Sequence, residues 1–313
     1  AWLCGQKHCA HFRVYVSLDQ HWFVSTNNVR YPLRYYSSRD VLENIAAHCA
    51  RDGELPWNVA FHPYPEDLRW PDFWHDRAPD FTFTTPKITF KNMEVLEAYL
   101  SQPSMLYRGA PRRIIFSEQG FNSHSGALQA LTEKMAEAGY VLAYLKARQM
   151  KTVDMLMHHA YTDNPREFGL NLGIRRYDPA APGHAGEKKP VYFAVRDMDT
   201  PQEAERVAQA RAFIGEELFD YLLHPPIEYG DRDASRDNEF EPRNPKSRGC
   251  PSKARGAALF LCAKAAPFPI RTIQAANRTE FTSALRRTVV PHFPSAYPVK
   301  VGAYLLCKSP PFP

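Results

Sequence analysis

The chain has 313 residues, a net charge of +5, and 44% hydrophobic and 23% charged residues, which is typical of a globular protein with one large or two modest domains. No apolar run approaches the roughly 18 residues that a membrane-spanning helix needs. Six cysteines are too few to staple a chain of this length as a disulfide scaffold. We therefore expect a globular protein with no membrane partner.

The positive charge is concentrated near the end of the chain. From Glu241 onward there are 12 Lys or Arg residues against 2 Asp or Glu, together with 11 of the 27 prolines. The basic residues are scattered and no binding motif accompanies them, which favours a solvated, poorly ordered extension over a nucleic-acid-binding arm. The sequence thus predicts a structured domain over residues 1–228 and a disordered basic, Pro-rich tail over residues 229–313.

Four apolar, strand-like runs alternate with helical patterns in the first part of the chain. The predicted strands are Phe12–Leu18, Trp57–Phe61, Arg113–Phe116 and Val153–Met157. Apolar residues at three- and four-residue spacing predict helices over Arg39–Arg51, Asn92–Leu100 and about Leu128–Leu145. This rhythm is typical of repeated β–α units, and hence of a parallel sheet whose strands are buried on both faces.

The region after the fourth strand is less regular. Residues 163–190 are rich in glycine, proline and asparagine and predict a loop. Val191–Val195 predicts either a short strand or the start of a closing helix. The sequence Thr200-Pro201-Gln202-Glu203 is a capping-box signature for a helix that we expect to reach about His224.

Polar and aromatic side chains follow each of the four predicted strands. They are Asp19, His21 and Trp22; His62 and Tyr64; Glu118 and Gln119; and His158, His159 and Asp163. The carboxyl ends of parallel strands meet at one edge of a sheet, so we expect these residues to line a common pocket. No glycine-rich phosphate loop follows any strand, which favours a (β/α)8 TIM barrel over a doubly wound, nucleotide-binding sheet.

This mixture of side chains suits a carbohydrate ligand. Aromatic rings stack on the apolar faces of sugar rings, while carboxylates and imidazoles bind hydroxyls and carry protons. Glu118 is the strongest candidate for a catalytic residue, because it follows an apolar strand and directly precedes Gln-Gly. An acidic residue in this place points into the mouth of a barrel.

Five ordered segments make the sequence recognisable: SLDQHW, WNVAFHPYPEDL, ITFKNMEVL, SEQGFNS and HHAYTDN…GLNLG. Over about Arg13 to Thr200 they resemble an uncharacterised family of glycoside-hydrolase-like TIM barrels. That family looks like the large superfamily of retaining glycosidases, in which a glutamate at the end of the seventh barrel strand is the nucleophile. Glu118 matches that position, so the resemblance implies a partial barrel containing strands five to eight.

The resemblance also implies roles for the other residues. Glu118 would be the nucleophile of a retaining, two-carboxylate mechanism. Sugar rings would stack on Trp22 and Tyr64, and hydroxyl binding or stabilisation of the ionised Glu118 would fall to Asp19, His21, His62, Gln119 and His159. The expected ligand is a carbohydrate, and neither a cofactor nor a metal is implied. The cellular compartment stays open.

One departure from the superfamily concerns the general acid/base, which is there a glutamate at the end of the fourth strand. The segment Ala1–Ala10 contains no carboxylate. We therefore expect the acid/base and strands one to four to be missing from this chain, as in a truncated gene product. The resemblance predicts a hydrolase-like protein and leaves open whether this chain is an active enzyme.

Two other functions stay open at this point. A metal-dependent hydrolase would draw ligands from several strand ends, among them Asp19, His21, His62, His159 and Asp163, although no zinc-like spacing is present. A non-catalytic carbohydrate-binding remnant would keep the polar rim and lack the acid.

Overall fold

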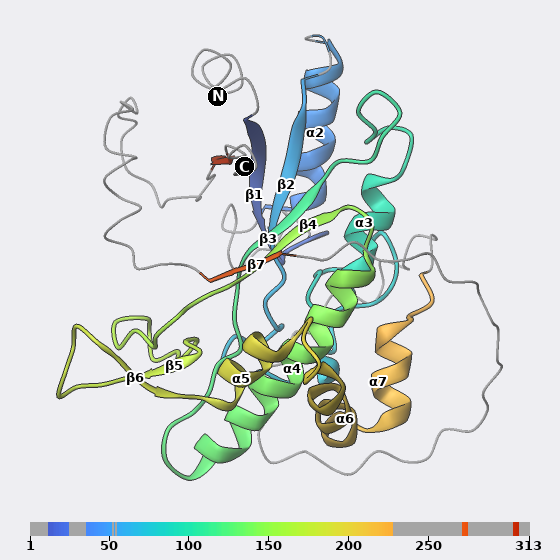
Figure 1. Cartoon of the computed structure of the whole chain (residues 1–313). Coiled ribbons are helices and arrows are strands. Elements are labelled where there is room, and N and C mark those ends of the chain that lie inside the picture. Colours follow the sequence, from blue (N-terminus) through green and yellow to red (C-terminus); the bar gives the residue numbers. More distant parts are fainter. Residues whose placement is uncertain are drawn as a thin grey trace.

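The computed structural model describes residues 12–24, 36–51, 53, 55–227, 271–274 and 303–306. A parallel four-stranded sheet forms its centre, in the order β4-β3-β2-β1 (Figure 1). The strands are β1 (Arg13–Asp19), β2 (Trp57–His62), β3 (Ile114–Gln119) and β4 (Val153–His158). The predicted parallel sheet is therefore confirmed, and each of these strands lies beside the one that precedes it in the chain.

Helices connect the four strands and bury their apolar residues against the sheet. They are α2 (Ser38–Arg51), α3 (Glu94–Leu100) and α4 (Gln129–Gln149), with single 3-10 turns η1 (Phe73–His75) and η2 (Gly126–Leu128). Their apolar side chains form one core with strand residues such as Leu18, Phe61 and Phe116. The predicted helices are confirmed to within a few residues, although Leu128 and Leu131 of the predicted stripe are exposed and residues 138–147 of α4 are buried on every side.

The other face of the sheet carries a separate, smaller cluster. Tyr15, Ala60 and Ile115 pack together there, away from the main core. Successive side chains of a strand point to opposite faces, so Ser17 and Ser117, two residues further along, share this second face. The second face leads directly to the carboxyl ends of the strands.

The region after β4 contains more structure than the sequence predicts. The expected loop over residues 163–190 includes an antiparallel pair, β5 (Arg175–Tyr177) and β6 (Ala185–Lys188). These strands lack an apolar alternation, so the sequence gives no signal for them. Val191–Val195 is helical and belongs to α5 (Pro190–Asp197).

The predicted helix from Thr200 to His224 is in fact two helices, α6 (Glu203–Ile214) and α7 (Glu216–Leu223). Gly215 breaks them apart with a φ of 99°, a left-handed value that glycine adopts without a steric penalty. The capping box does not close either. The Glu203 carboxylate accepts the Asp199 N–H at 2.8 Å and pairs with Arg148 at 2.7 Å, so it is not free to reach back to Thr200.

Two segments of the tail extend the sheet at its edges. β7 (Arg271–Gln274) runs parallel to β4, and β8 (Ala303–Leu306) runs antiparallel to β1. Both strands lie within residues 229–313, which the sequence assigns to a disordered basic tail. The rest of the tail lies outside the described residues, so the domain boundary at residue 228 stays a prediction. In the described part of the chain, no helix has the length and apolar character needed to cross a membrane.

Candidate functional site

The carboxyl ends of the four parallel strands meet at one edge of the sheet. Asp19 pairs in register with His62 across β1 and β2, and Gln119 pairs with His158 across β3 and β4. The backbone N–H of His159 donates to the Gln119 carbonyl at 2.6 Å. The first residue beyond β4 is thereby fixed beside the last residue of β3.

His62 connects three strands through both ring nitrogens. Its Nδ1 lies 3.1 Å from Asp19 Oδ1, and its Nε2 lies 3.1 Å from Ser117 Oγ and 3.4 Å from Ser17 Oγ. The imidazole is buried, whereas the Asp19 side chain is 76% exposed. The ring is therefore held from both sides, by a carboxylate at the open edge and by hydroxyls in the interior.

Glu118 lies at the end of β3 and is half-buried. The Tyr64 hydroxyl, from the segment after β2, donates to Glu118 Oε1 at 3.4 Å. Burial, followed by the negative charges of Glu118 and Glu167, raises the pKa of Tyr64 well above its usual range. Tyr64 therefore stays protonated and acts as a hydrogen-bond donor that orients the Glu118 carboxylate.

Glu167 joins this edge although the sequence did not single it out. It lies in the loop between β4 and β5, and its Oε1 is 2.6 Å from His159 Nε2. Both side chains are partly open to solvent, at 22% for Glu167 and 28% for His159. The residue follows no strand and belongs to no spacing pattern, so only the path of the loop brings it to the strand ends.

Two predicted binding residues do not reach the site. Trp22 is fully buried, donates from its indole N–H to the Phe83 carbonyl at 2.9 Å and packs edge-on against Tyr99. Gln119 is buried and donates to the Met157 carbonyl. Neither side chain offers a surface to a ligand, so Trp22 does not serve as a stacking platform and Gln119 does not bind hydroxyls in this conformation.

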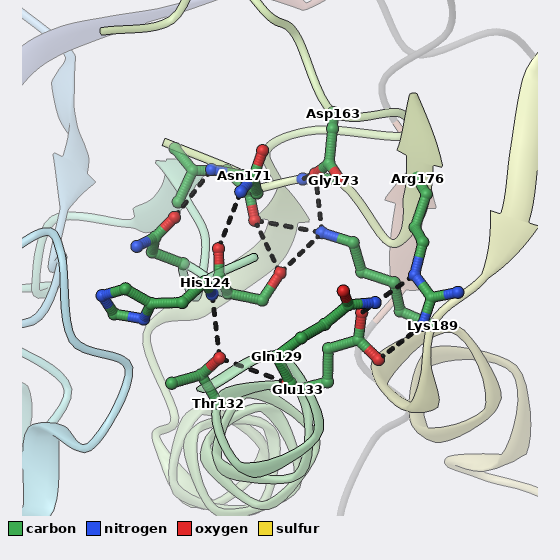
Figure 2. A network of polar contacts seen from close by, with 12 residues as sticks. His124, Gln129, Thr132, Glu133, Asp163, Asn171, Gly173, Arg176 and Lys189 are labelled. Atoms are coloured by element: carbon green, nitrogen blue, oxygen red, sulfur yellow. Dashed lines mark hydrogen bonds and ion pairs between the residues drawn. The ribbon is translucent and has the colours of Figure 1, made fainter. Parts of the chain in front are cut away.

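Asp163 also lies in the interior, in the network that Figure 2 shows. Lys189 Nζ contacts Asp163 Oδ1 at 2.6 Å, Ser123 Oγ at 2.9 Å and the Asn171 carbonyl at 3.1 Å. Burial raises the pKa of Asp163 and lowers that of Lys189, and their mutual attraction opposes both shifts. This buried pair connects the loop after β3 with the loop after β4. It therefore fixes the two loops that border the strand ends.

The geometry does not favour the metal-dependent alternative. The described ranges contain no group of three or more His, Cys, Asp or Glu side chains placed to hold an ion. Asp163 is engaged by Lys189 and His159 by Glu167. A protein metal site usually needs at least three such ligands, and Asp19 with His62 supplies two.

Gly120, directly after β3, makes the close approach of the two strand ends possible. A Cβ at this position would lie 2.1 Å from the His159 carbonyl oxygen. We expect Gly120→Ala to destabilise the protein by about 1–3 kcal/mol, because backbone must move to admit the methyl group. Thermal melts against Gly183→Ala, where a Cβ meets nothing within 4 Å, provide the check. Equal melting temperatures for the two variants would contradict this account.

His158 is expected to make stability fall in mild acid. Burial lowers its pKa to about 4, and burial with the nearby Lys87 lowers that of His21 to a similar value. The unfolded chain binds protons near pH 6.5 and the folded chain does not, so stability is lost as pH falls from about 6.5 to 4. The His158 share is up to about 3 kcal/mol. Urea denaturation across this range should show a flatter profile for His158→Gln, and an unchanged slope would argue against a neutral, buried His158.

These features define a mixed α/β protein with a parallel four-stranded sheet and a cluster of carboxylates and imidazoles at its carboxyl edge. The chain belongs to a family of unknown function, DUF5722, which matches residues 2–221. A search of curated proteins finds no significant match. A solved family 39 glycoside hydrolase from the gut symbiont Bacteroides cellulosilyticus WH2 is weakly similar, with 19% identity and a TM-score of 0.29. The match covers 44% of this chain and 26% of that enzyme, a likeness too small to carry a functional argument.

Proposed function

We propose that this chain is a glycoside-hydrolase-like protein that binds carbohydrate at the carboxyl edge of its sheet. In this proposal Glu118 is the nucleophile of a retaining mechanism, and the four β–α units correspond to strands five to eight of a (β/α)8 barrel. The observation that carries it is the half-buried Glu118 at a strand end, with the Tyr64 hydroxyl donating to its carboxylate.

The topology supports the barrel assignment. The four strands follow one another without a reversal of order, whereas a doubly wound sheet binds its ligand where the strand order reverses. In a barrel, catalytic residues come from the carboxyl ends of several different strands. Asp19, His62, Glu118 and His159 come from the ends of four strands in this way.

The contacts of Glu118 support its role as a nucleophile. A carboxylate that attacks the anomeric carbon must be ionised and fixed in direction. The hydrogen bond from the Tyr64 hydroxyl fixes the direction of one oxygen of the Glu118 carboxylate. Asp19 with His62, and His159 with Glu167, place further donors and acceptors for sugar hydroxyls along the same edge.

The proposal is tested by trapping the covalent intermediate. We expect the full chain, incubated with 2,4-dinitrophenyl 2-deoxy-2-fluoroglycosides of several sugars, to release one equivalent of dinitrophenolate. Mass spectrometry should locate the sugar on the peptide that contains Glu118. Glu118→Gln should give neither release nor adduct, while Glu187→Gln, an exposed glutamate of β6, should behave as wild type.

An adduct on another residue, or on Glu118→Gln, would remove Glu118 from the mechanism. The absence of any adduct across the panel, together with glycan binding by calorimetry, would assign the chain to the carbohydrate-binding remnant. Stoichiometric zinc or manganese, with activity lost to a chelator, would support the metal-dependent hydrolase.

A further inference from the structure

We propose that Glu167, paired with His159, is the proton donor and acceptor of this site, so that the second carboxylate of the reaction lies in the 164–170 loop of the chain itself. The inference rests on the proposed function, in which Glu118 is the nucleophile. It differs from the sequence-based expectation that the acid/base is missing from the chain.

The carboxylates near this edge divide into two groups according to their partners. Asp163 is buried against Lys189, and Glu133 is buried and paired with Arg176, so both are neutralised inside the protein (Figure 2). Glu118 and Glu167 are instead partly exposed and have a tyrosine and a histidine as partners. Among the described residues, no lysine or arginine contacts either of these two carboxylates, so both are chemically suited to proton transfer or attack.

Asp19 is the other carboxylate of the strand ends, and it is less suited to the role. Its side chain is 76% exposed, and its histidine partner, His62, directs its second nitrogen to interior hydroxyls. Glu167 is 22% exposed, and its partner His159 directly follows β4, the strand adjacent to that of Glu118. A proton donor works best where water is largely excluded, which favours Glu167.

The loop that carries Glu167 is fixed to the loop that follows Glu118. Asn171 N–H donates to Asn122 Oδ1 at 2.6 Å, its side-chain amide donates to the Ser123 carbonyl at 2.9 Å, and its own carbonyl accepts the Ser123 N–H at 3.2 Å. Lys189 binds the same two loops from the interior. Glu167 is therefore held relative to Glu118 by backbone contacts and not by its side chain alone.

The turn that follows Glu167 presents an aromatic side chain, Phe168, to solvent. Glu167 N–H donates to the Asn164 carbonyl at 3.0 Å, and Leu170 N–H donates to the Glu167 carbonyl at 2.8 Å in a second turn that contains Phe168. Phe168 is fully exposed and has a φ of 52°, a left-handed value that costs about 1–2 kcal/mol for a residue with a side chain. In this proposal the exposed ring of Phe168, next to Glu167 in the chain, is the apolar platform on which a sugar ring stacks.

The surroundings of Tyr64 indicate that Glu118 and Glu167 face the same part of the site. Its hydroxyl contacts Glu118, and the charge of Glu167 is the next largest carboxylate contribution to its raised pKa, ahead of that of Asp19. The geometric links through His159 and Asn171 lead to the same arrangement. Glu118, at the end of β3, and Glu167, in the loop after β4, thus both lie near Tyr64.

The reaction balances with one proton held by the His159–Glu167 pair. In the first step Glu118 attacks the anomeric carbon, the bond to the leaving oxygen breaks, and that oxygen takes the proton from Glu167. In the second step Glu167, now a carboxylate, takes a proton from water as the water oxygen attacks the anomeric carbon and the ester to Glu118 breaks. In both steps His159 holds the carboxyl group of Glu167 in place.

The test compares leaving groups in Glu167→Gln. A 2,4-dinitrophenyl glycoside needs no protonation to leave, whereas a methyl or 4-methylphenyl glycoside of the same sugar does. We expect Glu167→Gln to cleave the second kind about 10²–10⁴-fold more slowly. With the first kind it should release one equivalent of dinitrophenolate at the wild-type rate and then turn over slowly. Azide should restore that slow phase and give a glycosyl azide of retained configuration.

Two further variants separate folding and binding from proton transfer. Glu187→Gln makes the same carboxylate-to-amide change on a 78% exposed side chain and should match wild type on both substrates. Phe168→Ala should raise KM on both substrates with little change in kcat, and it should leave the melting temperature unchanged because the ring is fully exposed.

The outcomes distinguish the two levels of the argument. Suppose that Glu167→Gln lowers the rate of the first bond cleavage equally for both leaving groups, or for neither. Either result would overturn the role of Glu167, while Glu118 would remain the nucleophile. No cleavage of any dinitrophenyl glycoside by the wild-type chain would overturn the proposed function itself, and the role of Glu167 with it.

Discussion

Replacing Glu118 with glutamine is expected to lower kcat on an activated aryl glycoside by roughly 10⁴-fold or more. Glutamine keeps the shape of the side chain and still accepts the hydrogen bond from Tyr64, but its amide does not attack an anomeric carbon. The lost interaction develops in the transition state, so substrate binding should stay nearly intact. Steady-state kinetics and calorimetric binding on the same preparation provide the two measurements.

The shorter variant Glu118→Ala adds a chemical control. Azide or formate fits the space that the carboxylate vacates and should restore part of the turnover by attacking the anomeric carbon. The product should then be a glycosyl azide of inverted configuration, the opposite of the outcome expected for Glu167→Gln. Near-normal turnover by Glu118→Gln, with an intact fold by circular dichroism, would exclude Glu118 as the nucleophile.

The central β–α units were predictable because their signals are local. Phe12–Leu18 is a short apolar, β-branched run, and apolar residues recur every three or four positions along α4, so each element could be recognised from its own residues. The elements that were missed or wrongly predicted have weak local signals. The polar strands β5 and β6 have no apolar alternation. The break at Gly215 depends on a left-handed backbone conformation, and a single glycine within a helical pattern does not reveal that conformation.

The candidate site was predictable only in part, since burial and loop paths are tertiary properties. Asp19, His62, Glu118 and His159 could be selected because each ends or follows a strand of a parallel sheet. The same rule also selected Trp22, because the sequence does not reveal that its ring turns into the core. Glu167 was missed for the opposite reason, since it lies eight residues beyond its partner His159 in a loop without a pattern.

Lys189 connects the stability of the protein to the geometry of its site. Its ammonium group is buried and binds Asp163, Ser123 and the Asn171 carbonyl together (Figure 2). Removing one member of a buried ion pair leaves the other charge without compensation in a low-dielectric environment. The partner loops are those that follow Glu118 and carry Glu167, so the loss is local to the proposed site.

We therefore expect Lys189→Met to lower the free energy of unfolding by about 3–5 kcal/mol. The double variant Lys189→Met/Asp163→Asn leaves no isolated charge. Its loss of unfolding free energy should therefore be smaller than the sum of the losses for Lys189→Met and Asp163→Asn alone. The matched control is Lys188→Met on the adjacent, exposed residue, which should change stability by no more than about 0.5 kcal/mol. Urea denaturation of the four variants tests this ordering. If Lys189→Met proved as stable as Lys188→Met, the buried pair would not hold the two loops together, and the fixed spacing of Glu118 and Glu167 would need another support.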